Sequence, residues 1–204
     1  MKFYKYHGAG NDFIIFNNLD NSFLIDNNFI RKICHRRFGI GADGVMLLNR
    51  SQNYDFEMQF FNSDGYEGSM CGNGGRCISA FAKKTGIIKD HAKFRAIDGE
   101  HEAFVYSDNS VKLKMSDVEN IITDENYFFL NTGSPHYVEF VDDVDKKDVF
   151  SEGKKIRFSQ KFLPEGTNVN FAQICENNIK LRTYERGVED ETLACGTGTV
   201  ATAL

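Results

Sequence analysis

Two cysteines stand in the same short pattern at distant points of the chain. Cys71 begins Cys-Gly-Asn-Gly and Cys195 begins Cys-Gly-Thr-Gly, and small or apolar residues follow each. A helix that starts at a cysteine presents partial positive charge and unpaired N–H groups to the thiol, which lowers the thiol pKa. An isolated cysteine is usually a small buried hydrophobe. This matched pair in glycine-rich breaks instead predicts two catalytic thiols around one anionic substrate.

The other three cysteines have a different setting. Cys34, Cys77 and Cys175 each lie on the apolar period of a predicted helix or strand, where a thiol serves packing. The chain contains no Cys-x-x-Cys, and no histidine pair has the spacing of a zinc-binding helix. These patterns disfavour a metal site and dithiol redox chemistry.

Two further segments each allow a functional and a structural interpretation. Ser134-Pro135-His136 could supply a catalytic imidazole, or it could be a turn with a hydrogen-bonded histidine. Glu185-Arg186, at the end of a predicted strand, could bind a zwitterion through the guanidinium and the carboxylate. It could equally be a solvated surface pair.

The elements that must position these residues follow from the period of the apolar side chains. Residues 2–17 predict a hairpin around a glycine-rich turn, and residues 28–38 predict a helix. Strict alternation predicts a strand over 54–60, and a helix is expected from Cys71 to the Lys83-Lys84-Thr85-Gly86 stop. Short alternating segments over 93–140 indicate antiparallel strands, and two more strands are expected at 168–175 and 178–184.

The two ends of the chain resemble each other. Asn62 stands nine positions before Cys71, and Glu185 stands ten before Cys195, each opening an acidic loop after a strand. Upstream, Gly10-Asn11-Asp12-Phe13 has a loose counterpart in Thr167-Asn168-Val169-Asn170-Phe171. A duplicated α/β unit is the economical interpretation, although two glycine-rich turns can match by chance. We expect an N-terminal lobe at 1–115 and a C-terminal lobe at 116–204.

Composition limits the classes of partner. The chain has 204 residues, of which 41% are hydrophobic and 26% charged, with a formal net charge of −5 and no basic stripe. Nucleic acid is therefore not an expected partner. No apolar run approaches the roughly 20 residues of a membrane span, and the N-terminus shows no secretory signal. The expectation is a cytoplasmic protein with no membrane partner.

The segment Gly39-Ile40-Gly41-Ala42-Asp43-Gly44 matches the dinucleotide-binding fingerprint by letter. It follows a predicted helix and precedes a predicted strand, which is the reverse of the order that a dinucleotide site needs, so we interpret it as a chance match.

Six motifs run in order through the chain and together resemble the diaminopimelate epimerase family. They are His7-Gly8-Ala9-Gly10-Asn11-Asp12-Phe13, Phe61-Asn62-Ser63-Asp64-Gly65, Met70-Cys71-Gly72-Asn73-Gly74-Gly75-Arg76, Pro164-Glu165-Gly166-Thr167-Asn168, Glu185-Arg186-Gly187 and Ala194-Cys195-Gly196-Thr197-Gly198. The resemblance implies an α+β fold of two pseudo-symmetric lobes, each a curled, mostly antiparallel sheet around a central helix. It also implies an isomerase that interconverts LL- and meso-2,6-diaminopimelate for lysine and peptidoglycan precursors, without pyridoxal phosphate or metal. Its partner would be this small amino acid, and a homodimer is an oligomeric state that the family allows.

The resemblance also assigns roles, residue by residue. Cys71 and Cys195 would be the acid and base, exchanging roles with the direction of the reaction, and His136 and Glu185 would be a supporting pair beside the thiols. The α-carboxylate would lie in a cradle that consists of Gly72, Asn73, Gly196 and Thr197. The contacts that fix the rest of the substrate would come from Asn11, Asn62, Asn168, Glu185 and Arg186.

Three departures from the family pattern are visible. Gly44 stands where some members carry a ligand-binding glutamine, and Ser134 where many carry asparagine. The chain ends at Leu204, inside the second predicted helix, whereas family members continue with further strands. The resemblance therefore implies a second lobe that is truncated at its C-terminal end.

Three alternatives remain open at the level of sequence. The first is a proline or hydroxyproline racemase of the same fold, which also uses two cysteines, although Glu185-Arg186 favours a substrate with a charged distal end. The second is a cysteine hydrolase or transferase with Cys195 as nucleophile and His136 as base, which leaves Cys71 unexplained. The third is an amino-acid-binding protein that does not turn its ligand over.

Overall fold

The computed structural model describes residues 2–23, 25–68, 71–115 and 117–204. Contacts between residues divide the chain into two units, Met1–Lys114 and Met115–Leu204. Each unit contains one β-sheet and is described by itself. Ser69 and Met70, at the end of the predicted loop before Cys71, lie outside the described residues, as does Ser116.

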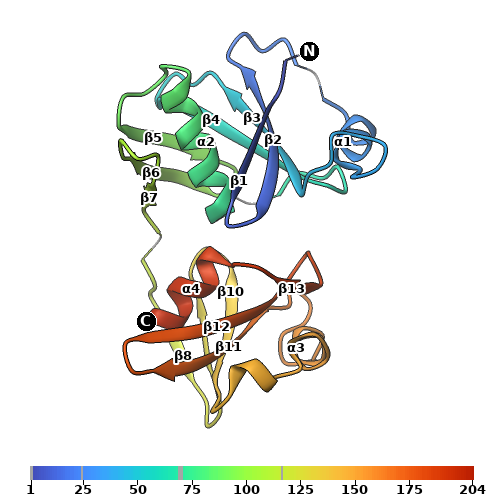
Figure 1. The fold of residues 1–204 in the computed structure, drawn as a ribbon, viewed down its shortest axis with the longest axis vertical. Coiled ribbons are helices and arrows are strands. Elements are labelled where there is room, and N and C mark those ends of the chain that lie inside the picture. The colour runs from blue at the N-terminus through green and yellow to red at the C-terminus, as the bar shows by residue number, and fades with distance from the viewer. Residues whose placement is uncertain (1, 24, 69–70, 116) are drawn as a thin grey trace. The chain divides into compact units, whose positions relative to one another are not determined.

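Unit 1 contains a seven-stranded sheet with the strands in chain order (Figure 1). Its strands are β1 (Tyr4–Gly8), β2 (Asn11–Asn18), β3 (Gly44–Asn49), β4 (Phe56–Asn62), β5 (His91–Ala96), β6 (Gly99–Val105) and β7 (Val111–Leu113). Its helices are α1 (Asn27–Cys34) and α2 (Gly72–Lys84). Strand pairing is antiparallel except at β2–β3 and β4–β5, which are parallel.

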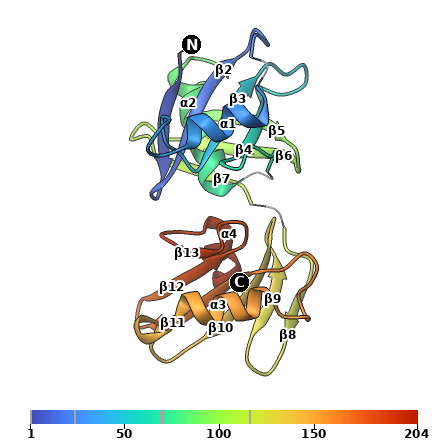
Figure 2. The ribbon, with the colours of Figure 1, turned by 90° about the vertical axis from the view of Figure 1, so that its right-hand side faces the viewer.

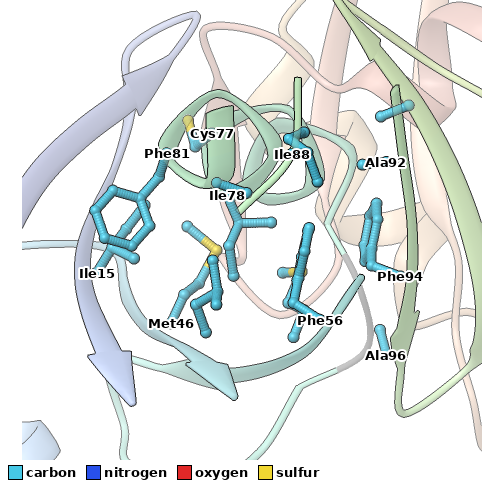
Figure 3. Close-up of a cluster of buried hydrophobic side chains, with 14 of the residues drawn as sticks. Ile15, Met46, Phe56, Cys77, Ile78, Phe81, Ile88, Ala92, Phe94 and Ala96 are labelled. Carbon is cyan, nitrogen blue, oxygen red and sulfur yellow. The ribbon is translucent and has the colours of Figure 1, made fainter. Parts of the chain in front are cut away.

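The sheet of unit 1 curls around α2, which contacts both the first and the last strands. Figure 3 shows Ile78 and Phe81 of α2 among side chains that the surrounding strands contribute. Alternate residues of β2 serve opposite faces: Phe13 and Ile15 pack in the cluster around α2, and Ile14 and Phe16 in the cluster around α1. The strand is buried on both faces, which explains its unbroken apolar run.

Unit 2 contains a six-stranded sheet in the order β13-β12-β11-β10-β9-β8. The strands are β8 (Ile121–Thr123), β9 (Phe128–Asn131), β10 (Pro135–Phe140), β11 (Asn168–Cys175), β12 (Asn178–Glu185) and β13 (Asp190–Thr192). The helices are the 3₁₀ turn η1 (Val144–Lys146), α3 (Val149–Arg157) and α4 (Gly196–Ala203). Figure 2 shows α3 in front of this sheet. Helix α4 packs with Leu130 and Val138 in a separate cluster from that of α3.

The two units repeat one topology. The order β1-β2-α1-β3-β4-α2 recurs as β9-β10-α3-β11-β12-α4, with η1 added before α3 and β13 added before α4. In both units the three successive strand pairs are antiparallel, parallel and antiparallel. The expected α+β fold of two pseudo-symmetric, mostly antiparallel lobes, each with a central helix, is therefore confirmed.

One detail of the predicted repeat is wrong. Asn11 begins β2, but Asn168 begins β11, which is the counterpart of β3. The register aligns Phe13 with Gly44 in unit 1 and His136 with Asn168 in unit 2. The counterpart of the Asn11 segment is therefore the strand of His136. The sequence match failed because both segments are short asparagine-containing strand starts.

The helix expected at 28–38 ends at Cys34. The ring Nδ1 of His35 accepts hydrogen bonds from the backbone N–H groups of Arg37 and Phe38, which offers the chain an alternative to another helical turn. The strand expected at 54–60 runs two residues later, as β4. Helix α3, which the apolar period did not predict, begins at the N-cap Asp148, whose side chain accepts from the Ser151 N–H.

Truncation of Ile78 tests the importance of the helix inside the curled sheet. Ile78 is fully buried, so Ile78→Ala removes apolar contacts and leaves a cavity. We expect the free energy of unfolding to fall by about 2–5 kcal/mol. Urea unfolding measures the change, and Ile97→Ala, at a side chain 64% exposed, should stay within about 0.5 kcal/mol of the parent. Equal losses in the two variants would contradict the assignment of the core.

Candidate active site

Cys71 is the N-cap residue of α2. Its backbone is extended, and its carbonyl accepts the first helical hydrogen bond, from the Gly75 N–H at 2.8 Å. The thiol is half-buried and makes no capping bond to its own helix. The N–H groups of the first helical turn have no partner within a helix, so they and the helix dipole can stabilise an anion at this point. The predicted position of Cys71 at a helix N-terminus is confirmed.

The side chain of Asn11 joins Cys71 to the first turn of α2. Its Oδ1 accepts from the Cys71 thiol at 3.6 Å and from Asn73 Nδ2 at 3.3 Å. Asn73 Oδ1 in turn accepts from the Arg76 guanidinium. The structure thus brings together three residues expected in the site, Asn11, Cys71 and Asn73.

A charged cluster stands behind Asn11 and fixes its amide. Asn11 Nδ2 donates to the Asp43 carboxylate at 2.8 Å, so the amide oxygen faces the thiol. Arg36 bridges Asp43 and Asp12 at 2.6 and 2.8 Å, and Lys5 lies 2.7 Å from Asp12. Burial disfavours ionisation of Asp12, but the hydrogen bonds from Arg36 and Lys5 outweigh it and hold the carboxyl pKa below its usual range.

Asn62 ends β4 beside Gly44 of β3. Its backbone carbonyl accepts from the Gly65 N–H at 2.9 Å, and its N–H donates to the Tyr66 carbonyl, so it opens the turn that leads toward Cys71. A Cβ at Gly44 would overlap the Phe60 ring and the Phe61 carbonyl. Because of this crowding, no larger residue fits position 44 without a shift of β4.

Cys195 occupies the corresponding place in unit 2, the N-cap of α4. The residue is buried, and its Sγ lies 3.4 Å from the Thr197 hydroxyl. Its carbonyl accepts from both the N–H and the hydroxyl of Thr199 at 2.9 Å. Thr132 donates to the Thr197 carbonyl at 2.9 Å and thereby ties the first turn of α4 to the end of β9. The predicted position of Cys195 at a helix N-terminus is also confirmed.

His136 lies in β10 and is fully buried. Its Nδ1 is 3.0 Å from Asn170 Nδ2. Burial, the larger cause, and charge repulsion by Arg186 together lower the pKa of the imidazole to about 4. At neutral pH His136 is therefore uncharged. Its place in a strand shows that it is not the simple turn histidine that the sequence also allowed.

Asn168 connects three segments of unit 2. Its Nδ2 donates to the Ser134 hydroxyl at 2.7 Å and to the Pro135 carbonyl, and its Oδ1 accepts from the Arg186 N–H at 2.9 Å. Ser134 thus contacts a residue expected to bind substrate. Glu185 ends β12, and its carbonyl accepts from the Glu189 N–H at 2.8 Å. Within unit 2, the structure therefore groups Asn168 with Arg186, at the strand end that Glu185 also occupies.

The other three cysteines have different surroundings. Burial raises the pKa of Cys34 to about 11 and that of Cys77 to about 12. Both serve packing, as expected. Cys175 differs, because it ends β11 and is only partly buried. The apolar alternation of that strand does not persist to its last residue.

Sequence reasoning missed two residues of these networks, Asp43 and Asn170. Asp43 lies in the glycine-rich loop that was set aside as a false nucleotide motif. Asn170 is fully buried in β11 between apolar neighbours. A polar residue on an otherwise apolar strand was the signal available for Asn170. Among the described residues, no group of three or more His, Cys, Asp or Glu is arranged to hold a metal ion.

Known proteins match this sequence over nearly its whole length. The sequence profile of diaminopimelate epimerases matches residues 3–121 and 128–204. The chain belongs to the diaminopimelate epimerase family. The diaminopimelate epimerase of Flavobacterium psychrophilum is 52% identical, over 100% of this chain and 80% of that protein. That of Chlorobaculum tepidum is 47% identical, over 97% of this chain and 80% of that protein.

A solved structure supports the same fold. The Bacillus anthracis phenazine biosynthesis protein of the PhzF family superposes with a TM-score of 0.71, covering 98% of this chain and 78% of that one. Its sequence is only 14% identical, so it bears on the fold alone. The two-lobed architecture of the diaminopimelate epimerase family is thus present here with both cysteines at helix starts.

Thiol reactivity tests the contrast between Cys71 and the packing cysteines. Brief treatment of the folded protein with iodoacetamide at pH 8 should alkylate Cys71 well before Cys34 and Cys77, because the thiolate is the reactive form and burial keeps the latter two protonated. Peptide mass spectrometry gives the order. Equal labelling in denaturant is the control, and faster labelling of Cys34 or Cys77 in the folded state would contradict this account.

The buried histidine should make stability depend on pH. Below pH 6.5 an unfolded histidine takes up a proton, whereas folded His136 stays neutral until about pH 4. Stability is therefore lost as pH falls through this window, by at most about 1.4 kcal/mol per pH unit from this group. Urea unfolding of the parent and of His136→Gln between pH 7 and pH 4 measures the two slopes. The slope should be shallower in His136→Gln, and identical slopes would count against a depressed pKa.

Proposed function

We propose that this chain interconverts LL- and meso-2,6-diaminopimelate by moving a proton at one α-carbon between Cys71 and Cys195. Membership of the family supports the reaction and the substrate. The observation that supports the assignment of the two thiols is that each half of the repeat places a cysteine at the N-cap of its central helix. Such an enzyme is an isomerase that serves lysine and peptidoglycan precursor biosynthesis.

The proposed reaction needs one thiolate and one thiol. The thiolate takes the α-proton and becomes a thiol, which leaves a carbanion that the α-carboxylate delocalises. The opposite thiol then gives its proton to the other face of the carbon and becomes the thiolate. No atom or electron is lost or gained, and the two cysteines have exchanged protonation states. The reverse reaction runs from that exchanged state.

The proposed substrate contacts come from both units. N–H groups of Gly72 and Asn73 at the start of α2, and of Gly196 and Thr197 at the start of α4, would bind the α-carboxylate. The amino-acid end distant from the reacting carbon would be held by the four residues Asn11, Asn62, Asn168 and Arg186. Glu185 would pair with an ammonium group, and Glu185 and His136 would support the thiols.

We propose a cytoplasmic location for this protein. Cys34, Cys77 and Cys175 are thiols, which suits a reducing cytoplasm. None of the helices formed by the described residues is long and apolar enough to cross a membrane. The net charge of −5 disfavours nucleic acid as a partner. We propose that the partner is a small amino acid and that the protein does not bind a membrane. We also propose that the protein forms a homodimer and that its two lobes are residues 1–115 and 116–204.

Solvent isotope incorporation tests the reaction. In deuterated water the protein should place deuterium at the α-carbon of LL- and meso-diaminopimelate as it interconverts them, because the proton returned comes from a thiol that exchanges with solvent. Nuclear magnetic resonance and mass spectrometry follow the label. Exchange of proline in place of diaminopimelate would move the assignment to the racemases. An acyl-enzyme on Cys195, trapped for mass spectrometry, would instead indicate a hydrolase, and tight binding without exchange would indicate a binding protein.

Replacement of either cysteine tests the two-base mechanism. Cys71→Ala and Cys195→Ala should each lower the rate of epimerisation by at least about 10²–10⁴-fold, since each removes the proton carrier of one face. Cys175→Ala, at a thiol outside both helix starts, should keep near-normal kcat. Near-normal turnover in either of the first two variants would exclude the paired-thiol mechanism.

A further inference from the structure

Asn170 is a fully buried polar side chain that the proposed reaction does not yet use. It lies in β11, beside His136 and Tyr137 of β10 and Thr183 of β12. A Cβ at Gly198 in the first turn of α4 would overlap Asn170 Oδ1 and would lie 3.3 Å from Cys195 Sγ. Asn170 therefore packs directly beneath the helix start that carries Cys195.

The hydrogen-bond partners of Asn170 define which end of its amide is which. Nδ2 lies 2.8 Å from the Tyr137 carbonyl, which can only accept. Oδ1 accepts from the Thr183 hydroxyl at 2.9 Å. A flipped amide would place an oxygen against the Tyr137 carbonyl oxygen in a buried setting, which is costly. The NH₂ group is thus held toward β10.

This orientation determines the protonation of the neighbouring imidazole. One hydrogen of Asn170 Nδ2 goes to the Tyr137 carbonyl, and the other points to His136 Nδ1 at 3.0 Å. Nδ1 must therefore be the unprotonated acceptor, and in a neutral ring the proton is on Nε2. His136 Nε2 is buried and has no hydrogen-bond partner among the described residues. A buried N–H without a partner is a donor that a bound group can satisfy.

We propose that Asn170 is a positioning residue that holds His136 as the Nε2–H tautomer, so that the ring offers a hydrogen-bond donor and not a base. This inference rests on the proposed function, in which His136 supports the acid–base chemistry. An N–H donor in a dry setting stabilises an anion, either a thiolate or a carboxylate of the substrate. A ring with the opposite tautomer would present a lone pair to the same anion and repel it.

Nitrogen-15 resonances of the histidine rings of the full chain test the tautomer directly. At pH 7.5 the His136 signals, assigned by their loss in His136→Gln, should show a protonated Nε2 and an unprotonated Nδ1. Asn170→Asp replaces the donor by a carboxylate, which accepts from Nδ1, so Nδ1 should become protonated. Thr183→Val is the second variant, because it removes the anchor of Oδ1 without a buried charge and should yield a mixture of tautomers. A parent protein with a protonated Nδ1, or variants whose His136 signals match the parent, would overturn the inference.

Kinetics separate positioning from simple support of the fold. In Asn170→Asp and Thr183→Val, kcat for diaminopimelate should fall at least about tenfold, with KM changed by less than about threefold and the circular dichroism spectrum retained. A loss confined to KM would overturn the assigned role. If the parent shows the expected tautomer but exchanges no α-proton of diaminopimelate, the proposed function fails while the tautomer assignment stands.

Discussion

Each unit is organised around the N-terminus of its central helix, where a cysteine is the N-cap residue. A helix start concentrates partial positive charge and unpaired N–H groups within its first turn. Cys71 and Cys195 occupy that point in their respective units as N-cap residues. In unit 1 the apolar cluster around α2 holds the helix in the sheet, and Asn11 contacts the thiol at its start. The proposed chemistry would thus depend on where these two helices begin.

Glycines in the first turns of α2 and α4 allow the helix starts to pack closely and leave space for a ligand. Gly74 of α2 lies where a Cβ would come within 3.3 Å of Met46 and Met58, and Gly198 of α4 lies against Asn170. Small residues therefore let the helix start sit directly on the strands. They also leave the backbone N–H groups open to a ligand. The two thiols contact different side chains. The Cys71 thiol donates to Asn11, whose amide is held by Asp43 of a charged cluster, whereas the Cys195 sulfur lies beside the Thr197 hydroxyl. This difference gives two pseudo-symmetric thiols different environments.

Local features of the sequence predicted much of this fold. The strands expected at 168–175 and 178–184 are present as β11 and β12, and β12 extends one residue further. Both helices that begin at a cysteine start where expected.

The predictions that failed concerned features that depend on contacts distant in sequence or on side chains that compete for backbone hydrogen bonds. The parallel pairs β2–β3 and β10–β11 have no local signal, because a crossover separates their strands. Helix α1 stopped early because His35 satisfies the next N–H groups, and α3 has a glycine at position 153 in its middle. The site followed the same rule: Cys71 and Cys195 were visible from spacing, whereas Asp43 and Asn170 act only through neighbours on other strands.

A crystal structure with a non-reactive diaminopimelate analogue bound would show whether the two proposed catalytic thiols face one carbon from opposite sides. We expect Cys71 Sγ and Cys195 Sγ each to lie roughly 3–3.5 Å from the α-carbon, on opposite faces, which is the separation of a near-attack arrangement. We also expect the α-carboxylate to accept hydrogen bonds from N–H groups at the starts of both α2 and α4. A complex in which only one sulfur approaches the carbon, or in which both sulfurs lie on one face, would exclude the paired-thiol mechanism.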